Sequence, residues 1–346
     1  MVSGDLFVQG NAFLGEEFEL SSVTIVVSNG KITAVEEECD RHGPWICPAF
    51  FNAHTHVGDT VAMDLPVSGT LEELVTPPDG LKHRILARTP RDRLIEGMRA
   101  SIRTMYETGT AGFADFREGG PEGIMSLMDA AEGIPCSPVL FGRDGGEKHG
   151  RGLGISGARD VPDIDEKVQQ ARAMGKQIAF HAGERDSLDI DQAISYDPDM
   201  LIHCTHATRP QLAECAEREI PIVICPRSNW RLGVTSSPEH PPVSLMYEVG
   251  CTVLLGTDNV MFVQPDMWQE MAFMSAVYRS APRDILRSAV GGSSVFGEEF
   301  LIKKGNPARF FIIDPHISNM RFSHDPCKTV VNRAGAVNIV KKVFSS

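Results

Sequence analysis

Short apolar segments recur along the middle of the chain and alternate with longer segments of helical periodicity. These apolar runs are rich in β-branched residues, and they span residues 46–52, 110–116, 138–142, 152–156, 177–182, 200–205, 220–225 and 251–257. Because most are nearly continuous in apolar character, they are typical of strands buried on both faces of a parallel sheet. The run at 152–156 is the least regular of them.

Helical patterns fall between most of these runs. The clearest spans 90–108, where Thr89 can cap the start, Pro90 suits the first turn and Gly109 suits the left-handed position after the end. Similar patterns span 121–132, 163–174, 209–219 and 242–249. Strands that alternate with helices over about 250 residues predict an α/β fold of the (β/α)8 TIM-barrel class. An open doubly wound sheet is the alternative, but no GxGxxG follows an early strand.

The two ends of the chain have a different pattern. Residues 1–45 alternate apolar and polar positions, and Asn29-Gly30 between two such segments is a strong hairpin signal. Residues 306–346 also resemble strands, and neither end has enough apolar residues for a core of its own. We therefore expect 1–45 plus 306–346 to form one small β-sandwich subdomain beside a barrel of residues 46–305.

Composition narrows the possible partners and the cellular location. A net charge of -13 and a pI of about 5.3 make nucleic acid an unlikely partner, because an acidic surface repels phosphates. No apolar stretch approaches the length of a membrane span, and the first residues lack a signal-peptide pattern, so we expect a cytoplasmic protein without membrane contact. Self-association into a homodimer is left open.

The cysteines do not predict a structural metal site. None of them forms a CxxC pair, and several lie inside apolar runs, which indicates buried free thiols in a reducing compartment. They are Cys39, Cys47, Cys136, Cys204, Cys215, Cys225, Cys251 and Cys327.

Histidine and aspartate residues follow four of the predicted barrel strands. His54 and His56 lie two residues apart in "AFFNAHTHVG", so in an extended chain both side chains point the same way and could bind one metal ion. Three further segments end in candidate ligands: "QIAFHAGE" with His181 and Glu184, "MLIHCTHA" with His203 and His206, and "TVLLGTDN" with Asp258. The carboxyl ends of barrel strands carry the active sites of such enzymes. A core histidine could explain any one of these residues, but the whole set predicts a metal centre.

With these motifs the chain resembles the amidohydrolase superfamily, and in particular its deaminase-like and chlorohydrolase-like members, which include cytosine, guanine and S-adenosylhomocysteine deaminases. The resemblance covers nearly the whole chain, including "CPRSN" and the ending "KKGNPARFFIID". It implies that one divalent metal is bound by the set His54, His56, His181 and Asp258. It further implies that Glu184 shuttles protons and that His203, with His206 as second choice, polarises the metal-bound water. Asn229 would support the loop of Asp258 or be purely structural.

The chemistry of this set is hydrolytic. A divalent cation lowers the pKa of its bound water towards about 7, which makes hydroxide available for attack. Asp258 can accept the water's proton, and Glu184 can pass a proton to a ring nitrogen and then to the leaving amine. The predicted function is therefore a metal-dependent deaminase (aminohydrolase) that releases ammonia from a small heterocyclic substrate such as a purine, pyrimidine or related base.

The number and kind of metal ions follow from what the sequence lacks. Two-metal relatives carry a carbamylated lysine at the end of strand four, where this chain has "RGLGISG". A single metal is therefore expected, with Zn2+ favoured and Fe2+ or Mn2+ as alternatives. The other zinc-deaminase arrangement, with HxE and PCxxC, is absent as well.

Substrate contacts are less sharply predicted. Arg117, Arg143 and Arg227 follow three strands and could each bind a carboxylate or carbonyl, or be structural. The glycine-rich segment 142–157 is expected to be a loop over the site, with His149 or Arg151 touching substrate. The segment after "HTH" lacks the Trp-and-Glu arrangement by which S-adenosylhomocysteine deaminases hold ribose, which favours a free base. A cyclic amidohydrolase and a non-catalytic binding protein remain as alternatives.

Overall fold

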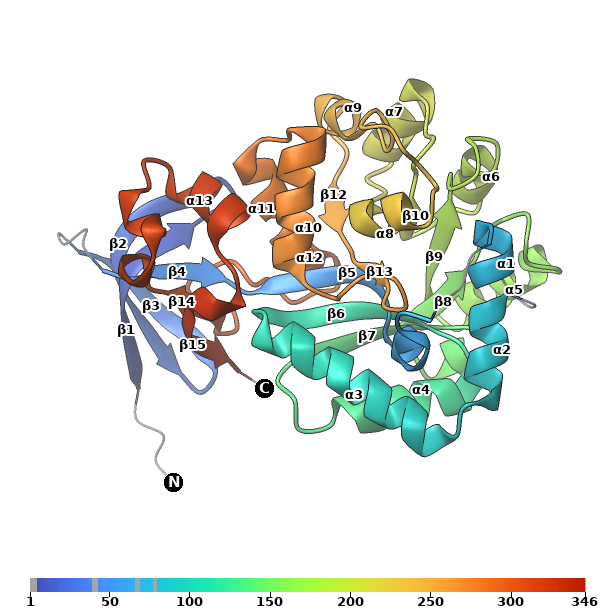
Figure 1. Ribbon diagram of the computed structural model, residues 1–346, viewed down its shortest axis with the longest axis horizontal. Helices are drawn as coiled ribbons and strands as arrows, with labels where there is room; N and C mark the ends of the chain where they lie inside the picture. Colours follow the sequence, from blue (N-terminus) through green and yellow to red (C-terminus); the bar gives the residue numbers. More distant parts are fainter. Residues whose placement is uncertain (1–4, 39–42, 66–68, 77–79, 346) are drawn as a thin grey trace.

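The computed structural model of the protein describes residues 5–38, 43–65, 69–76 and 80–345. A curved sheet of parallel strands lies at the centre of its larger part (Figure 1). Along the chain the strands are β5 (Phe50–His56), β6 (Thr110–Arg117), β7 (Ser137–Gly142), β8 (Gly152–Ile155), β9 (Gln177–Ala182), β10 (Met200–His203), β11 (Ile222–Ile224), β12 (Val253–Leu255) and β13 (Asp258–Asn259). Each of the eight apolar runs therefore contains a strand.

The sheet closes on itself through its last strand. β12 pairs with β11, and β13, which follows after Gly256 and Thr257, pairs with β5. β12 and β13 are thus two halves of the eighth barrel strand. The predicted (β/α)8 barrel is confirmed, and the open doubly wound alternative is wrong because an open sheet leaves its edge strands unpaired.

Helices surround the barrel and connect its strands. The predicted ones are α3 (Arg91–Glu107), α4 (Gly120–Ala131), α5 (Ile164–Ala173), α7 (Arg209–Glu217) and α9 (Val243–Glu248). Gly109 has a φ of +92°, as expected for the residue after α3. The others around the barrel are α6 (Ile190–Ser195), α8 (Pro226–Arg231), α10 (Met267–Phe273), α11 (Pro282–Val290) and α12 (Gly292–Val295).

Three short helical segments between β5 and α3 were not predicted. They are η1 (Val57–Ala62), α1 (Leu71–Val75) and α2 (Leu81–Arg88). The expectation that Thr89 caps α3 is wrong, because Thr89 ends α2 and its hydroxyl donates to the carbonyl oxygen of Ile85 at 2.8 Å. Pro90 takes the capping position of α3 without a side-chain hydrogen bond.

Both ends of the chain meet in one six-stranded sheet beside the barrel (Figure 1). Its spatial order is β15 (Ile339–Phe344), β14 (Arg309–Ile313), β4 (Trp45–Pro48), β1 (Leu6–Leu14), β2 (Glu19–Ser28) and β3 (Lys31–Glu37). The hairpin at Asn29-Gly30 is confirmed, since both residues have positive φ and Ser28 pairs with Lys31. The common β-unit is therefore confirmed, whereas its boundaries at 45 and 306 stay a prediction.

The first apolar run contains two strands rather than one. It breaks at Ala49, whose N–H donates to the carbonyl oxygen of Arg309, so that β4 belongs to the end sheet and β5 begins the barrel. One apolar core continues across this break. The Phe50 ring packs against those of Trp268 and Phe311, with centroids 4.8 and 5.1 Å away, and thereby joins the two sheets.

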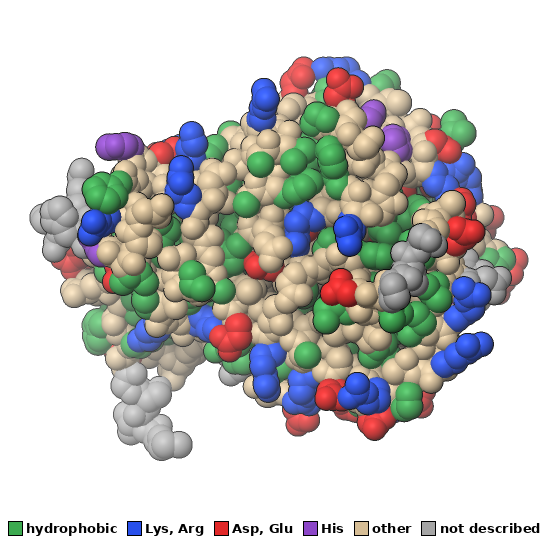
Figure 2. Space-filling view, in the orientation of Figure 1, with side chains coloured by type: hydrophobic (Ala, Val, Ile, Leu, Met, Phe, Trp, Pro, Cys, Tyr) green, Lys and Arg blue, Asp and Glu red, His purple; other side chains and the backbone are tan. Residues whose placement is uncertain are grey.

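The surface carries charges of both signs (Figure 2), whereas the cysteines that the structure describes lie inside the protein. None of the helices that the structure describes is long and apolar enough to span a bilayer. Acidic and basic side chains are interspersed over the face seen in Figure 2. Seven cysteines are free and buried, as expected, and Cys39 lies outside the described residues. Beside the end sheet, α13 (Pro326–Arg333) packs against α10 and α11.

Candidate metal centre

Three barrel strands bring the four predicted ligands together at one end of the barrel. His54 and His56 end β5, His181 lies near the end of β9, and Asp258 begins β13. Ring nitrogens of the three histidines lie within 4.8 Å of one another, and so do the ligand atoms of His54, His203 and Asp258. All of these side chains are buried. The cluster thus forms where parallel strands deliver their carboxyl ends.

Asp258 is the anionic member of the cluster. Its Oδ1 atom lies 3.3 Å from His54 Nε2 and 3.5 Å from His56 Nε2, while its Oδ2 atom accepts a hydrogen bond of 2.6 Å from Ser228 Oγ. Burial opposes its charge, but its hydrogen bond to His54 and the nearby histidines outweigh burial and hold the pKa of Asp258 well below its usual range. Asp258 is therefore a carboxylate at neutral pH.

Hydrogen bonds behind the rings orient two of the histidines. His56 Nδ1 lies 3.0 Å from the carbonyl oxygen of Phe116, and His181 Nδ1 lies 2.8 Å from that of Ile155. A carbonyl oxygen can only accept, so each Nδ1 carries the hydrogen and each Nε2 presents a lone pair to the cluster. Such rings are ready to bind a metal ion.

His54 gives the most direct indication that a cation belongs here. Its side chain is fully buried, yet neither ring nitrogen makes a well-formed hydrogen bond within the described part of the chain. Burial lowers the pKa of His54 to about 4 and that of His56 to about 3, so both rings are neutral and able to donate electron pairs. Buried polar atoms without partners are costly, and a metal ion would satisfy them. Three nitrogens and one carboxylate oxygen suit zinc, and also iron or manganese.

Three residues at this end of the barrel have a left-handed backbone conformation. His203, Cys204 and Asp258 have φ values of +74°, +46° and +60°, a region that costs free energy for residues other than glycine. Two of these residues belong to the cluster. The strain is consistent with a backbone shaped to aim the side chains of His203 and Asp258 inward.

Glu184 and His203 lie next to each other at the edge of the cluster. Glu184 Oε1 is 3.4 Å from His203 Nε2, and burial raises the pKa of Glu184, which favours a carboxyl group that can give up and take back a proton. His206 points elsewhere and packs against His240, with ring centroids 5.0 Å apart. The structure therefore brings His203, not His206, to the site.

The hydrogen bond of the Asn229 side chain favours the structural alternative for this residue. Its amide donates to Thr205 Oγ1 at 2.9 Å rather than to Asp258. The supporting residue is Ser228, one position earlier in "CPRSN". The motif indicated the right segment, but only the geometry of the turn into α8 decides which of the two side chains faces Asp258.

A small pocket of about 60 Å³ opens onto the cluster. Leu71 and Val75 of α1 form part of its wall, together with Lys82 of α2. Sequence reasoning missed this wall because short helices in a long connection carry little periodic signal. The strand-end residues that line the pocket are His56, His181, Glu184, His203 and Asp258.

The four candidate substrate residues fall in different places. Arg143 lines the pocket, and its Nε donates to the carbonyl oxygen of Gly154 at 3.1 Å. Arg117 is buried and paired with Glu118 at 2.7 Å, and it lines a separate cavity outside the barrel. Arg227 is paired with Glu270 at 2.7 Å. Neither of these two arginines lines the pocket.

Residues 142–157, which were expected to form a loop over the site, follow a different path in the structure. Residues 142–157 include a short helical turn, η2 (Gly146–Lys148), and the whole of β8. His149 is exposed, and neither it nor Arg151 lines the pocket. Arg151 leads into β8 and therefore lies at the opposite end of the barrel from the ligands, so contact of either residue with substrate in this pocket is not supported.

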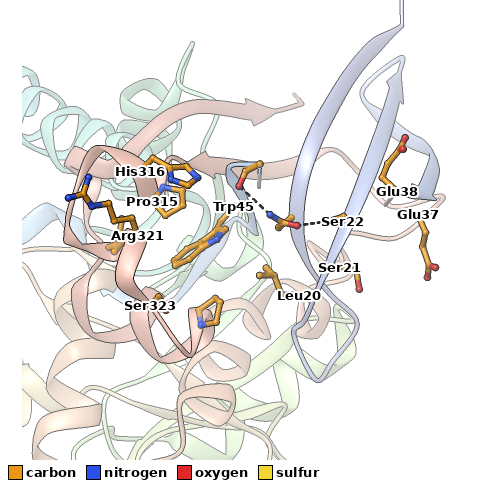
Figure 3. A pocket seen from close by; sticks show the side chains of 14 residues that line it. Leu20, Ser21, Ser22, Glu37, Glu38, Trp45, Pro315, His316, Arg321 and Ser323 are labelled. Atoms are coloured by element: carbon orange, nitrogen blue, oxygen red, sulfur yellow. Dashed lines mark hydrogen bonds between the residues drawn. The ribbon is translucent and has the colours of Figure 1, made fainter. Parts of the chain in front are cut away.

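A larger cavity of about 600 Å³ lies far from this chemistry, between the end sheet and residues 315–326. Figure 3 shows Trp45, Pro315 and Arg321 around it. It contains none of the clustered histidines, so size alone does not identify the site.

Comparisons with known proteins show what the chain is similar to. The model of the amidohydrolase family matches residues 45–149, and the model of adenosine deaminase matches residues 151–293. A protein of Methanothermobacter thermautotrophicus named "Putative aminohydrolase" is 32% identical over 96% of this chain and 95% of its own.

Two further relatives carry more specific names. A 5-methylthioadenosine/S-adenosylhomocysteine deaminase of Halobacterium salinarum is 25% identical over 92% of this chain and 86% of its own. The crystal structure of an adenosine deaminase from Xanthomonas campestris with bound zinc superposes with a TM-score of 0.77 at 16% identity, covering 99% of this chain and 92% of that one. The latter likeness supports the fold alone.

Proposed function

Because this chain belongs to the amidohydrolase family and is a hydrolase of carbon–nitrogen bonds other than peptide bonds, we propose that it deaminates a small aminated heterocycle. The observation that carries the proposal is the convergence of His54, His56, His181 and Asp258, with Glu184 and His203 beside them. The relative named as a 5-methylthioadenosine/S-adenosylhomocysteine deaminase favours an amino group on a purine or similar ring.

Each side chain has a role that follows from its position. His54, His56, His181 and Asp258 would hold one divalent metal, which when bound supplies a water of lowered pKa. Asp258 accepts a proton from the attacking water through Oδ1, since Ser228 holds Oδ2. Glu184 delivers its proton to the ring nitrogen, takes up the proton held by Asp258 and passes it to the leaving amine, and the hydroxyl of the tetrahedral carbon returns a proton to Glu184 as the carbonyl forms. His203, next to Glu184, orients the water. The carbon–nitrogen bond breaks and ammonia leaves.

One of the candidate substrate residues lines the pocket. Arg143 is positioned there to contact a carbonyl or carboxylate of the substrate ring. We retain 46–305 as the catalytic domain and place the protein in the cytoplasm, where its free buried thiols stay reduced.

We expect one metal ion per chain, with zinc favoured. β8, the fourth barrel strand, contains no lysine, and the nearest ones, Lys148 and Lys167, lie outside the pocket. Elemental analysis of the purified protein should give about one zinc, iron or manganese per chain by the ligand count. Two ions per chain would contradict the single-metal proposal.

The decisive experiment is a panel of aminated purines, pyrimidines, triazines and pterins, assayed for ammonia with zinc-loaded protein. Protein stripped of metal by a chelator is the control and should be inactive until zinc is restored. Ring opening of a cyclic amide without ammonia would favour the cyclic amidohydrolase. Full metal loading without turnover on a broad panel would favour a binding protein.

A further inference from the structure

A network of buried charges lies directly behind the ligand His56. Asp59 follows β5, Lys82 comes from α2, and Asp115, Arg117 and Glu118 come from β6 and the residue after it. Lys82 Nζ is 3.1 Å from Asp59 Oδ2 and 3.0 Å from Glu118 Oε1. Buried lysine is rare in proteins unless it is paired, and here its partners come from two other elements.

Glu118 occupies the centre of this network. Its Oε2 atom accepts a 2.7 Å hydrogen bond from Arg117, and its Oε1 atom lies 3.4 Å from His56 Nδ1, on the side of the ring away from the metal ligands. Arg143 approaches the same oxygen to 3.9 Å. A single carboxylate therefore faces three cations and one metal-binding imidazole.

The charge balance makes this carboxylate important for a bound cation. Lys82, Arg117 and Arg143 are positive charges that repel a divalent ion in a buried region. Asp59 pairs with Lys82 and Asp115 with Arg117, but Glu118 is the carboxylate of the network that reaches all three cations and His56. Glu118 offsets that repulsion, and its negative charge 3.4 Å from His56 Nδ1 supports the electron-pair donation of Nε2, while the carbonyl oxygen of Phe116 accepts the Nδ1–H. Burial alone would raise the pKa of Glu118, but Lys82 and Arg117 outweigh burial and hold it well below the usual range.

We propose that Glu118 is a positioning residue of the metal centre, which orients His56 and offsets the buried cations behind it so that a divalent metal binds tightly. The inference rests on the proposed metal-dependent function. It also assigns Lys82 a distinct role: the lysine fixes Glu118 and ties α2 to the wall of the pocket, at an electrostatic cost to the metal.

The test measures zinc affinity by competition with a chromophoric chelator, starting from metal-free protein. Glu118→Gln keeps the shape and removes the charge, and it should weaken zinc binding by about 10- to 100-fold, the usual effect of losing such a partner. Lys82→Met should retain or tighten zinc binding, because it removes a repelling cation. The double variant should bind zinc more tightly than Glu118→Gln alone, since both charges are then absent.

Glu270→Gln is the matched control. Glu270 is likewise buried and paired with an arginine, but it makes no hydrogen bond or ion pair with the proposed ligands within the described residues, so zinc affinity should stay near wild type. If Glu118→Gln alone does not fold, the double variant Glu118→Gln/Lys82→Met is compared with Lys82→Met instead, because neither of these proteins contains a buried Lys82 without its partner. Zinc affinity should then be lower in the double variant than in Lys82→Met.

Two results would overturn the inference. Zinc affinity of folded Glu118→Gln equal to wild type would remove the role of Glu118. Equal weakening by Glu118→Gln and Lys82→Met, adding up in the double variant, would reduce the network to a structural one. By contrast, a wild-type protein that binds no divalent metal would refute the proposed function itself, and this inference with it.

Discussion

Glu184 is the residue on which proton transfer in the proposed reaction depends. It follows His181 by three positions, lies 3.4 Å from His203, and is not one of the proposed ligands. Its place next to the cluster and the rise of its pKa by burial both suit a group that carries a proton between water and substrate.

We predict that Glu184→Gln lowers turnover by roughly 100-fold or more, the usual scale for losing a general acid-base residue, while metal content stays near wild type. Asp258→Asn should instead lower turnover and metal retention together, because Asp258 contacts His54 and His56. The measurements are ammonia release and bound metal on the same samples. Near-normal turnover in metal-loaded Glu184→Gln would falsify the proton-transfer role and direct attention to His203.

For single residues, the sequence indicated which side chains lie at the strand ends, but not which neighbouring side chains contact them. His54, His181 and Asp258 could be placed together because the ends of barrel strands must meet. Ser228 and Glu118 could not, since a hydroxyl or carboxylate near a strand end is common and its direction depends on the following turn. Arg117 follows its strand as predicted, yet its side chain turns out of the barrel towards Glu118.

Among the elements, the junction between β5 and the eighth strand decides how the barrel closes. Asn52 of β5 is fully buried; its amide donates to Thr257 Oγ1 at 2.7 Å, and its carbonyl oxygen accepts from the N–H of Thr257 at 3.0 Å. This pair of hydrogen bonds fixes the residue that precedes Asp258. The helical periods predicted the long helices, but a two-residue break in a strand and the short helices α1 and α2 have no periodic signature.

We predict that Asn52→Ala destabilises the protein by about 1–3 kcal/mol, because it removes two buried hydrogen bonds to Thr257, whose N–H then keeps only its longer bond to the carbonyl oxygen of His54. The fall should appear as a lower midpoint of urea unfolding. Asn332→Ala is the control, because Asn332 is exposed and donates only to the carbonyl oxygen of Lys328 within its own helix. An unchanged midpoint for Asn52→Ala would show that water or a shift of the strand replaces these bonds.

In the whole molecule, the end sheet and the barrel share one apolar core. Phe13 and Trp45 of the end sheet belong to the same cluster of buried side chains as the barrel residues Phe50 and Phe180. The small apolar content of each chain end already indicated that the two must combine. The division at Ala49 could not be predicted, because the apolar run continues from β4 into the first residues of β5 and only the pairing of β4 with β14 and β1 separates the two strands.

Six of the free thiols lie in this shared core and Cys136 lies in a second buried cluster, which gives a test of the packing of the whole molecule. Seven of the eight cysteines are buried and free. Burial raises the pKa of Cys215 to about 12 and those of Cys251 and Cys327 to about 11, so these thiols are protonated at neutral pH and shielded from reagents.

We predict that these seven thiols do not react with a disulfide reagent such as Ellman's reagent in the folded protein at pH 7.5, and that all of them react after unfolding in guanidinium chloride. The Cys39→Ser variant removes the one cysteine outside the described residues, so any fast reaction in that variant must come from the seven. A buried thiol becomes accessible only when the structure opens. The rate at which it reacts with the reagent therefore reports the free energy of that opening. Rapid modification of one or more thiols in folded Cys39→Ser would mean that the core opens locally far more readily than its packing implies.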